Sequence, residues 1–260
     1  MTAPYRVQAY NTARDSENKM HDDTVARRFG FTGGLVPGVD VYAYMVHAPV
    51  ARWGRTWLER GRAECRFLKP VYDGDEAIVE AVEEGDGLAL IVRSHGETCA
   101  AGSASLVSAV GSAPEFATPP ISPANRPPAD ERSLAVGTLL GMRPTVLTAE
   151  YAARYLADVR ESDPVYAQEG IAHPGVVLRT CNWALSHNVV LGPWMHVAST
   201  VQNIGLARVG DELTVRARVS AKYERKGHRF VELDALVLAS GRPVAHIAHV
   251  AIYRPREVAA

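Results

Sequence analysis

The stretch YNTARDSENKMH at residues 10–21 has a counterpart in the same chain, YLADVRESDPVY at residues 155–166. Each begins with a tyrosine and places polar residues at matching spacings behind it. Each is followed by Pro-Gly-Val, at residues 37–39 and 174–176, and these two copies lie 137 positions apart. A fixed period of this length predicts a tandem repeat of two similar halves.

The register of the repeat holds further along each half. Gly-Asp pairs at residues 74–75 and 210–211 lie 136 positions apart. The tyrosine stretches lie 145 positions apart, so the first half carries eight extra residues between His21 and Pro37. A duplicated unit whose polar residues have diverged predicts two pockets with different roles.

The composition is typical of a soluble globular protein, with 47% apolar and 22% charged residues. A net charge of -1 gives no basic field for nucleic acid, and no Lys/Arg-rich helix points to a membrane, so we expect neither partner. No apolar run approaches the roughly 18 to 20 residues that cross a bilayer, and the first residues lack a basic-then-apolar signal segment. We therefore expect a cytoplasmic protein.

A proline-rich segment separates the halves. Residues 111–131 contain six prolines with Ser, Ala and Asn between them, which excludes helix and central strand. We therefore predict an N-terminal unit at 1–110, a linker at 111–133 and a C-terminal unit at 134–260.

Strands are predicted from alternation. Between Leu213 and Lys222 the odd positions are apolar and the even positions polar, which is typical of a half-buried antiparallel strand. Similar patterns predict the further strands Phe230–Leu238, Pro243–Tyr253, Ile78–Val82, Leu88–His95 and Cys99–Val107.

Apolar segments after each Pro-Gly predict a buried central helix in each half. They span Val39–His47 and Val176–Val189, and Pro37 and Pro174 stand where proline is tolerated best, in a first helical turn. Pro49 should stop or kink the first helix. Helices and antiparallel strands in this order place each half in the α+β class.

This order of polar loop, Pro-Gly helix start and antiparallel sheet resembles the MaoC-like (R)-specific enoyl-CoA hydratase/dehydratase family. The likeness covers almost the whole chain and implies a double hot-dog, in which each repeat wraps a sheet around a central helix. The family signature is Tyr-x5-Asp-x-Asn-Pro-x-His, whose Asp and His activate water for addition to an enoyl thioester. In the first half, His21 and Asn18 match it, but Ser16 replaces the Asp and Lys19 the Pro.

The second half departs from the signature differently. Pro164 is kept, whereas Glu161 takes the Asp position, Asp163 the Asn position and Tyr166 the His position. Glu161 and Tyr166 form an alternative acid/base pair, with a desolvated glutamate as base and the phenol as donor, and Gly175 beside them. Neither half therefore has the complete dyad.

Chemistry in the first half depends on His21. Hydration needs one group that takes a proton from water and one that delivers a proton to the α-carbon, and a neutral imidazole can do the former near pH 7. Ser16 is too weak an acid to replace the missing carboxylate. We expect Glu17 or Asp15 to be the partner of His21, and Asn18 to position the reacting groups.

Backbone groups complete the predicted site. Gly38, at the start of a buried helix, can present its N–H to the thioester carbonyl, where enolate charge develops. Asp22 or Asp23 is expected instead to cap a short helix from Thr24 to Phe29.

Phosphate groups of coenzyme A require cations. The predicted turn at residues 222–229 supplies them through Lys222, Arg225, Lys226 and Arg229, while the matching turn at residues 83–86 is acidic. One thioester site per chain is therefore expected.

We predict a hydro-lyase that adds water to, or removes it from, a CoA or carrier-protein thioester, with no metal and no cofactor apart from the coenzyme A of the substrate. The alternatives are an acyl-CoA thioesterase and a non-catalytic acyl-thioester-binding subunit of a hydratase complex. We expect a homodimer. Cys65, Cys99 and Cys181 lack CxxC spacing and are predicted to be reduced packing residues.

Overall fold

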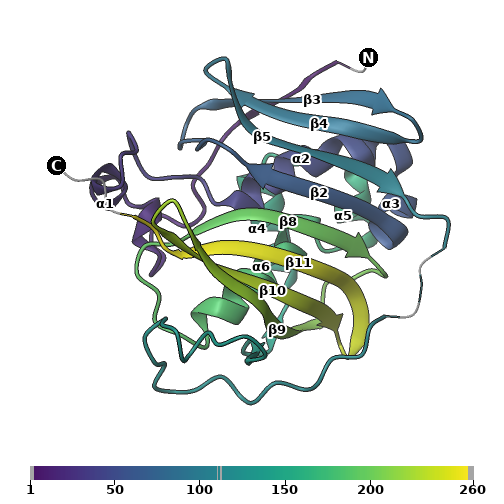
Figure 1. Cartoon of the computed structure of the whole chain (residues 1–260). Helices are drawn as coiled ribbons and strands as arrows, with labels where there is room; N and C mark the ends of the chain where they lie inside the picture. Colours follow the sequence, from purple (N-terminus) through teal and green to yellow (C-terminus); the bar gives the residue numbers. More distant parts are fainter. Residues whose placement is uncertain (1–2, 110, 112, 257–260) are drawn as a thin grey trace.

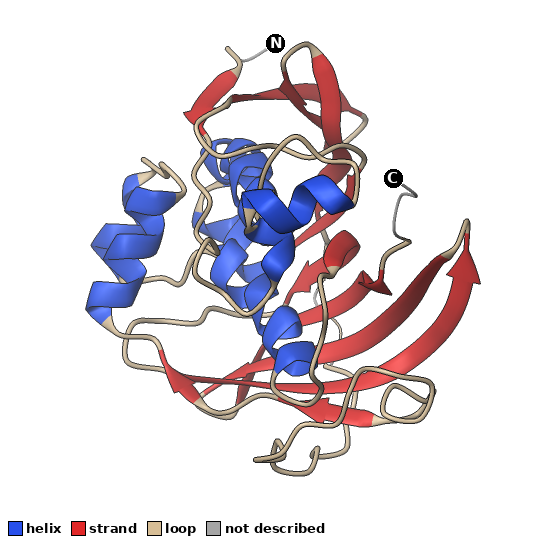
Figure 2. Ribbon diagram, turned by 90° about the vertical axis from the view of Figure 1, so that its left-hand side faces the viewer, coloured by secondary structure: helices blue, strands red, loops and turns tan. Residues whose placement is uncertain are grey.

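The structure is a computed structural model that describes residues 3–109, 111 and 113–256. Eleven strands, all paired antiparallel, form one curved sheet (Figure 1). The helices gather on the inner face of this sheet (Figure 2). The architecture confirms the α+β class.

Each half repeats the order of a polar segment, a central helix and a run of strands. The first half contains β1 (Tyr5–Gln8), the 3-10 helix η1 (Lys19–His21), α1 (Asp23–Arg28), α2 (Gly38–Trp53), α3 (Arg55–Arg60), β2 (Gly61–Phe67), β3 (Glu76–Glu84), β4 (Gly87–Ser94) and β5 (Glu97–Leu106). The second half contains β6 (Leu139–Gly141), β7 (Thr145–Val146), α4 (Ala149–Asp158), α5 (Pro164–Glu169), α6 (Pro174–Ser186), β8 (Met195–Asn203), β9 (Glu212–Arg225), β10 (His228–Ala239) and β11 (Arg242–Arg254).

The two halves share one sheet. Its strand order is β1-β3-β4-β5-β2-β8-β11-β10-β9-β6, with β7 also paired to β9. The seam between the halves is the antiparallel pair β2 and β8, which runs from Arg62 opposite Gln202 to Arg66 opposite Ala198. Groups on β8 can therefore reach the first half.

The strands predicted from alternation are confirmed as β3, β4, β5, β9, β10 and β11. Their inward residues are buried, as for Val215, Ala217 and Val219 on β9. The seam strands β2 and β8 were not predicted. Alternation is present in β2, where Ala63 and Cys65 point inward, but it covers only a few residues.

The central helices α2 and α6 lie against each other beneath the sheet (Figure 1). Pro49 was predicted to stop or kink the first helix, and it does not stop it, because α2 continues through it to Trp53. Proline removes a single N–H donor, and here Pro49 and Val50 are buried, so burial of the last turn outweighs the lost hydrogen bond. Helix α6 ends at Ser186, slightly before the predicted Val189.

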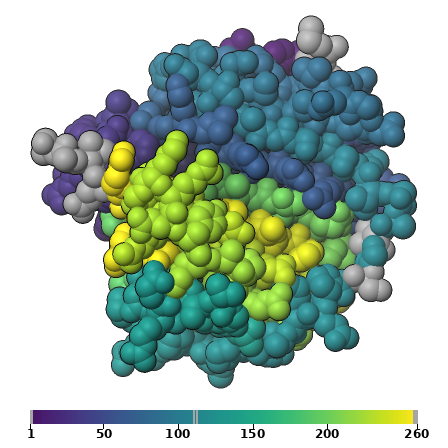
Figure 3. All heavy atoms as spheres, in the orientation of Figure 1, coloured from purple at the N-terminus to yellow at the C-terminus, as the bar shows by residue number. Residues whose placement is uncertain are grey.

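The proline-rich segment from residue 113 to 133 contains neither helix nor strand, apart from one bridge between Pro128 and Val190. In Figure 3 it runs along the lower edge of the molecule as teal spheres. The predicted first boundary falls at residue 110, outside the described residues, and the division into units stays a prediction. No helix in the described part of the chain is long and apolar enough to cross a membrane.

Candidate functional site

His21 ends η1 and is held in one orientation. Its Nδ1 lies 2.6 Å from the carbonyl oxygen of Leu35. A carbonyl only accepts, so Nδ1 carries the proton and Nε2 is unprotonated. Burial, the largest influence, lowers the pKa of His21, although the Leu35 carbonyl and the charge of Asp40 act in the opposite direction. The imidazole is therefore neutral at pH 7 and has the basic nitrogen that proton abstraction needs.

Asn18 fixes this histidine and ties the two halves together. Its side-chain oxygen accepts hydrogen bonds from the backbone N–H groups of Met20 at 3.2 Å and Trp194 at 3.1 Å. Its amide nitrogen donates to the Trp194 carbonyl at 3.0 Å and lies 3.2 Å from His21 Nε2. Every polar atom of the Asn18 side chain thus has a partner.

Two cavities meet at His21. The first, which we call the apolar cavity, has a volume of about 300 Å³. Its walls include the apolar residues Phe31, Leu35, Val36, Val41, Phe67 and Val71. The second, which we call the arginine cavity, has a volume of about 340 Å³ and is lined by Arg126, Arg143 and Arg179. A bound molecule could pass the imidazole with one end in each cavity.

The extra residues of the first half build one wall of the apolar cavity. Helix α1 lies within them, and its N-cap is Asp22, whose carboxylate accepts from the N–H groups of Thr24 and Val25, as expected. The chain that follows brings Phe31 and Leu35 to the cavity. The insertion therefore supplies both apolar surface and the carbonyl that orients His21.

Gly38 opens α2 beside the same cavity. Its N–H, the first of the helix, has no acceptor among the described residues. An added Cβ would lie 3.0 Å from Nδ1 of His196 and 3.1 Å from the Phe67 ring. The glycine thus leaves an N–H donor and a histidine nitrogen close together at the cavity wall.

His196 comes from β8, across the seam, and is 8% exposed. Its Nε2 lies 2.8 Å from Ser199 Oγ and 3.2 Å from the Ala198 carbonyl, so Nε2 carries the proton. Its Nδ1 is buried without a partner in the described structure. Burial, followed by the nearby charge of His249, holds the pKa of His196 well below its usual value, so this imidazole is neutral.

A second histidine continues this contact chain behind the cavity wall. Ser199 Oγ lies 3.1 Å from Nδ1 of His249, and the rings of His196 and His249 stack with centroids 4.2 Å apart. Burial lowers the pKa of His249 to about 3. Two neutral imidazoles bridged by a hydroxyl fix the direction in which His196 Nδ1 points.

The predicted carboxylate partners of His21 lie elsewhere. Glu17 forms an ion pair with Arg126, with oxygen–nitrogen distances of 2.9 and 3.1 Å, and its side chain is 75% exposed. Asp15 is exposed at the surface. The described contacts of the His21 imidazole include neither carboxylate, because this loop turns both toward solvent. The carboxylate whose charge favours the protonated form of His21 is instead Asp40.

Asp40 is completely buried in α2 and fully hydrogen-bonded. It accepts from Arg179 at 2.6 Å, Tyr155 at 2.9 Å and Thr12 at 2.5 Å. Such a pair is stable only when its charges are matched and its polar atoms satisfied. The network fastens α2 to α6 and places a guanidinium at the floor of the arginine cavity.

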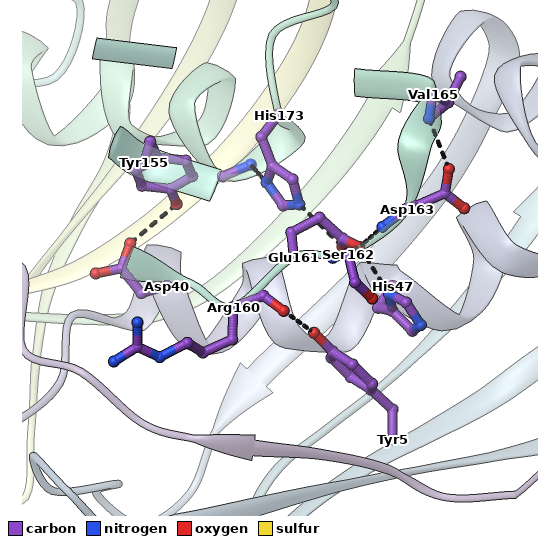
Figure 4. A network of polar contacts seen from close by, with 11 residues as sticks. Tyr5, Asp40, His47, Tyr155, Arg160, Glu161, Ser162, Asp163, Val165 and His173 are labelled. Carbon is purple, nitrogen blue, oxygen red and sulfur yellow. Dashed lines mark hydrogen bonds and ion pairs between the residues drawn. The ribbon is translucent and has the colours of Figure 1, made fainter. Parts of the chain in front are cut away.

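The corresponding position of the second half is a closed cluster (Figure 4). Glu161 has only 2% of its side chain exposed and lies 2.8 Å from His47 Nδ1 and 3.5 Å from His173 Nε2. It also accepts from the backbone N–H groups of Ser162 and Asp163, at 2.7 Å each. Burial alone would raise the pKa of Glu161, but the hydrogen bonds from His173, His47 and the backbone hold it well below its usual value. The predicted desolvated base is thus a stable carboxylate anion.

Gly175 and Tyr166 are enclosed as well. The Gly175 N–H donates to His173 Nδ1 at 3.1 Å, and an added Cβ would lie 2.2 Å from the Tyr155 hydroxyl oxygen. Tyr166 is 1% exposed, and its hydroxyl has no partner among the described residues. Neither residue lines the apolar or the arginine cavity.

The basic β9–β10 hairpin reaches the rim of the apolar cavity through His228. In Figure 1 its tip lies on the same side of the molecule as α1. Lys222 and Arg229 are engaged by Glu131, at 2.5 and 3.7 Å. Arg225 and Lys226 have no ion-pair partner in the described part of the chain, so these two remain available for anions.

Comparisons with known proteins agree with this architecture. No protein-family model matches the chain, and no curated protein sequence matches it. Among solved structures, a protein from Chloroflexus aurantiacus J-10-fl described as a MaoC domain protein dehydratase is 10% identical, with a TM-score of 0.66 over 97% of this chain and 93% of that one. A conserved hypothetical protein from Mycobacterium tuberculosis with a double hot-dog fold is 13% identical, with a TM-score of 0.63 over 95% and 93%.

A third structure, from Novosphingobium aromaticivorans DSM 12444 and described as a thioesterase, is 14% identical, with a TM-score of 0.51 over 85% of this chain and 88% of that one. The class of protein is thus established: this chain is a double hot-dog protein, and its fold is shared with MaoC-like dehydratases. The resemblance seen in the sequence is confirmed at the level of the fold.

Three residues near His21 were not selected from the sequence. His196 has no spacing motif, and Asp40 and Arg179 lie inside apolar helical segments. A buried charge on a central helix was the available sign for Asp40, because such a residue requires a partner. No local pattern marks His196, since the seam between β2 and β8 brings it to the site.

Proposed function

We propose that this protein is a hydro-lyase that reversibly hydrates the double bond of an enoyl thioester. The observation that carries the proposal is the unprotonated Nε2 of His21 at the junction of two cavities, one of which is also lined by Gly38, whose N–H has no acceptor among the described residues. An enolate that develops at the thioester oxygen needs such a donor, and the helix start adds a favourable dipole.

His21 is proposed as the general base. A water that replaces the long Asn18 contact gives its proton to Nε2, and its oxygen adds to the β-carbon. The electron pair of the double bond moves to the α-carbon and the thioester oxygen. The imidazolium then returns a proton to the α-carbon, which restores the neutral ring and balances the reaction.

His196 is proposed as the second polar group, in place of the carboxylate that the family signature supplies. Its free Nδ1 can accept a hydrogen bond from the attacking water or from the hydroxyl of the product. Ser199 and His249 keep that nitrogen unprotonated and aimed at the wall beside Gly38. The first half thus borrows a residue from the second.

Coenzyme A is proposed as the thiol carrier, with Arg225 and Lys226 on the hairpin as phosphate contacts at the rim of the apolar cavity. No metal or separate cofactor is needed for this chemistry, because a thioester already acidifies its α-proton. A homodimer remains our expectation.

The test is a panel of trans-2-enoyl-CoA esters of increasing length, in which hydration removes the conjugated absorbance and yields a 3-hydroxyacyl-CoA identified by mass spectrometry. We expect turnover of at least one ester. Absence of turnover for every ester at micromolar enzyme concentrations contradicts the proposal.

A second candidate, acyl-CoA hydrolysis, is favoured by the likeness to the fold of the Novosphingobium protein. Release of free thiol from saturated acyl-CoA esters distinguishes it from hydration. A third, a non-catalytic subunit that binds acyl thioesters, is favoured by the incomplete signature in each half. It predicts binding without turnover, restored by a co-purifying protein.

A further inference from the structure

The arginine cavity shares His21 with the apolar cavity and has a different chemistry. Two carboxylates face its three arginines, and each is already engaged. Glu17 pairs with Arg126, and Asp40 pairs with Arg179. Arg143 has no ion-pair partner in the part of the chain that the structure describes. The cavity therefore has one cation in excess.

Polar atoms at the junction also lack partners. Nε of Arg179 and Oδ1 of Asn182 are buried and make no hydrogen bond within the described structure. Asn182 lines both cavities, and Arg179 lines the arginine cavity. Buried polar atoms are normally hydrogen-bonded. The Nε–H of Arg179 is a donor that an anion can satisfy, whereas the Asn182 oxygen only accepts and needs a donor.

His187 adds a neutral N–H donor to the arginine cavity. Nδ1 of His187 accepts a hydrogen bond from the Arg143 backbone N–H at 3.0 Å, so the proton of this ring is on Nε2. Burial and the neighbouring Arg143 and Arg126 lower the pKa of His187, so the ring is neutral at pH 7. An anion in the cavity would meet N–H donors from Arg143, Arg126 and His187.

The cavity is close to the reacting position. It shares His21, Asn18 and Asn182 with the apolar cavity. Burial is the main cause that lowers the pKa of His21, and the charge of Arg179 acts weakly in the same direction. The phosphates of coenzyme A are separated from the thioester by the long pantetheine arm, so they cannot lie beside the reacting carbons. The β9–β10 hairpin offers them cations at the rim of the apolar cavity.

We propose that the acyl group of the substrate ends in a second carboxylate, which Arg143 and Arg126 bind in the arginine cavity. The substrate is then a monothioester of a short dicarboxylic acid. This inference rests on the proposed function, since it assumes that the thioester reacts at His21. Arginine suits the task because its planar guanidinium binds a carboxylate through two N–H groups.

The experiment compares two thioether analogues that can be neither hydrated nor hydrolysed, S-pentyl-CoA and S-(4-carboxybutyl)-CoA, by isothermal titration calorimetry. We expect the carboxylated analogue to bind at least about tenfold more tightly to the wild type, as for one charge-assisted contact. In Arg143→Gln, the ratio of the two affinities should fall close to one, while the affinity for the pentyl analogue stays unchanged.

Arg225→Gln on the hairpin is the matched control, because it removes an arginine that is proposed to hold phosphate. This substitution should weaken the binding of both analogues by the same factor. Glu17→Gln releases Arg126 from its ion pair and should raise the preference for the carboxylated analogue.

Equal affinities for both analogues in the wild type overturn the inference. An equal loss of affinity for both analogues in Arg143→Gln also overturns the inference, because the arginine cavity would then hold a phosphate of coenzyme A. Hydration of uncharged enoyl-CoA esters combined with equal affinities leaves the proposed function standing and removes only this inference. A strong, Arg143-dependent preference without any hydration supports the ligand class and contradicts the hydro-lyase.

Discussion

The two halves of this protein place polar residues at equivalent points of one fold and use them differently. In the first half, His21 lines two cavities, and the N–H of Gly38 has no acceptor among the residues that the structure describes. In the second half, Glu161 is locked between His47 and His173, and the N–H of Gly175 is capped. The comparison teaches that spare hydrogen-bonding capacity beside a cavity, and not the presence of an acid or base, marks the proposed reacting site.

The two halves also differ in how their buried polar atoms are hydrogen-bonded. In the closed cluster, hydrogen bonds surround the buried Glu161 carboxylate and stabilise the fold, while at the open site His196 Nδ1 lies at a cavity wall without a partner in the described structure.

The largest expected effect is on rate, at the equivalent positions His21 and Tyr166. His21→Gln removes the proposed base and should lower kcat by about 10² to 10⁴-fold, the range for general acid–base groups. Tyr166→Phe should leave kcat unchanged, because it deletes only a buried hydroxyl without a partner. Steady-state hydration assays measure both. Loss of activity in Tyr166→Phe alone would move the site to the second half.

Glu161→Gln tests the closed cluster. Losing the hydrogen bonds of a buried carboxylate should lower the free energy of unfolding by about 1.5 to 3 kcal/mol, measured by urea denaturation, while kcat of the folded protein stays the same. Glu17→Gln, in an exposed pair, should cost less than about 1 kcal/mol. A larger loss from the exposed pair than from Glu161→Gln would reverse our assignment of the two carboxylates.

The same cluster predicts a pH dependence of stability. The pKa of Glu161 is lowered by folding, so its stabilisation is fully present above the ordinary glutamate pKa and is lost as pH falls through the folded value. The urea midpoint of the wild type should therefore fall in acid more steeply than that of Glu161→Gln. Parallel curves for the two proteins would contradict this.

The two Pro-Gly glycines should respond oppositely to alanine. Gly175→Ala forces a methyl group against the buried Tyr155 hydroxyl and should cost about 1 to 3 kcal/mol of stability with kcat retained. Gly38→Ala meets His196 and Phe67 at the cavity wall, so kcat/KM should fall more than stability does. Thermal unfolding of both variants measures the loss of stability, and hydration kinetics measure the loss of kcat/KM. Equal responses would show that the two glycines have one common role.

The dependence of the rate on pH tests the protonation state of His21. Burial lowers the pKa of His21, so kcat/KM should be level near neutral pH and fall about tenfold per pH unit below an inflection under 6.5. The imidazole must be unprotonated, which gives an acid limb to the profile. A profile that rises toward acid would exclude His21 as the base.

The smallest effect is expected at the hairpin. Lys226→Gln should raise KM for a CoA ester a few-fold, less at high salt, because exposed charges are screened. Lys222→Gln is the matched control, since Glu131 already neutralises that charge, and it should change KM less. A larger effect at Lys222 would place the phosphates nearer to β9 than we propose.

Much of the fold was predictable. Alternation located β9, β10 and β11 and their counterparts, because a strand that buries one face must alternate. Helix α2 was predicted, but its end was not. Local rules treat Pro49 as a stop, whereas burial against the sheet carries the helix onward.

The sequence by itself determined the repeat, the α+β class and the order of the elements, because these depend on periodicity and on spacing along the chain. Resemblance to a family motif offered His21 as a candidate, and the Pro-Gly helix start offered Gly38. Only the tertiary structure decided that Glu17 turns to solvent, that Asp40 and Arg179 form a buried pair, and that His196 crosses the seam to the first half. The reason is physical: pairing of β2 with β8 and packing of α2 on α6 bring together residues more than a hundred positions apart, and burial then sets their charge.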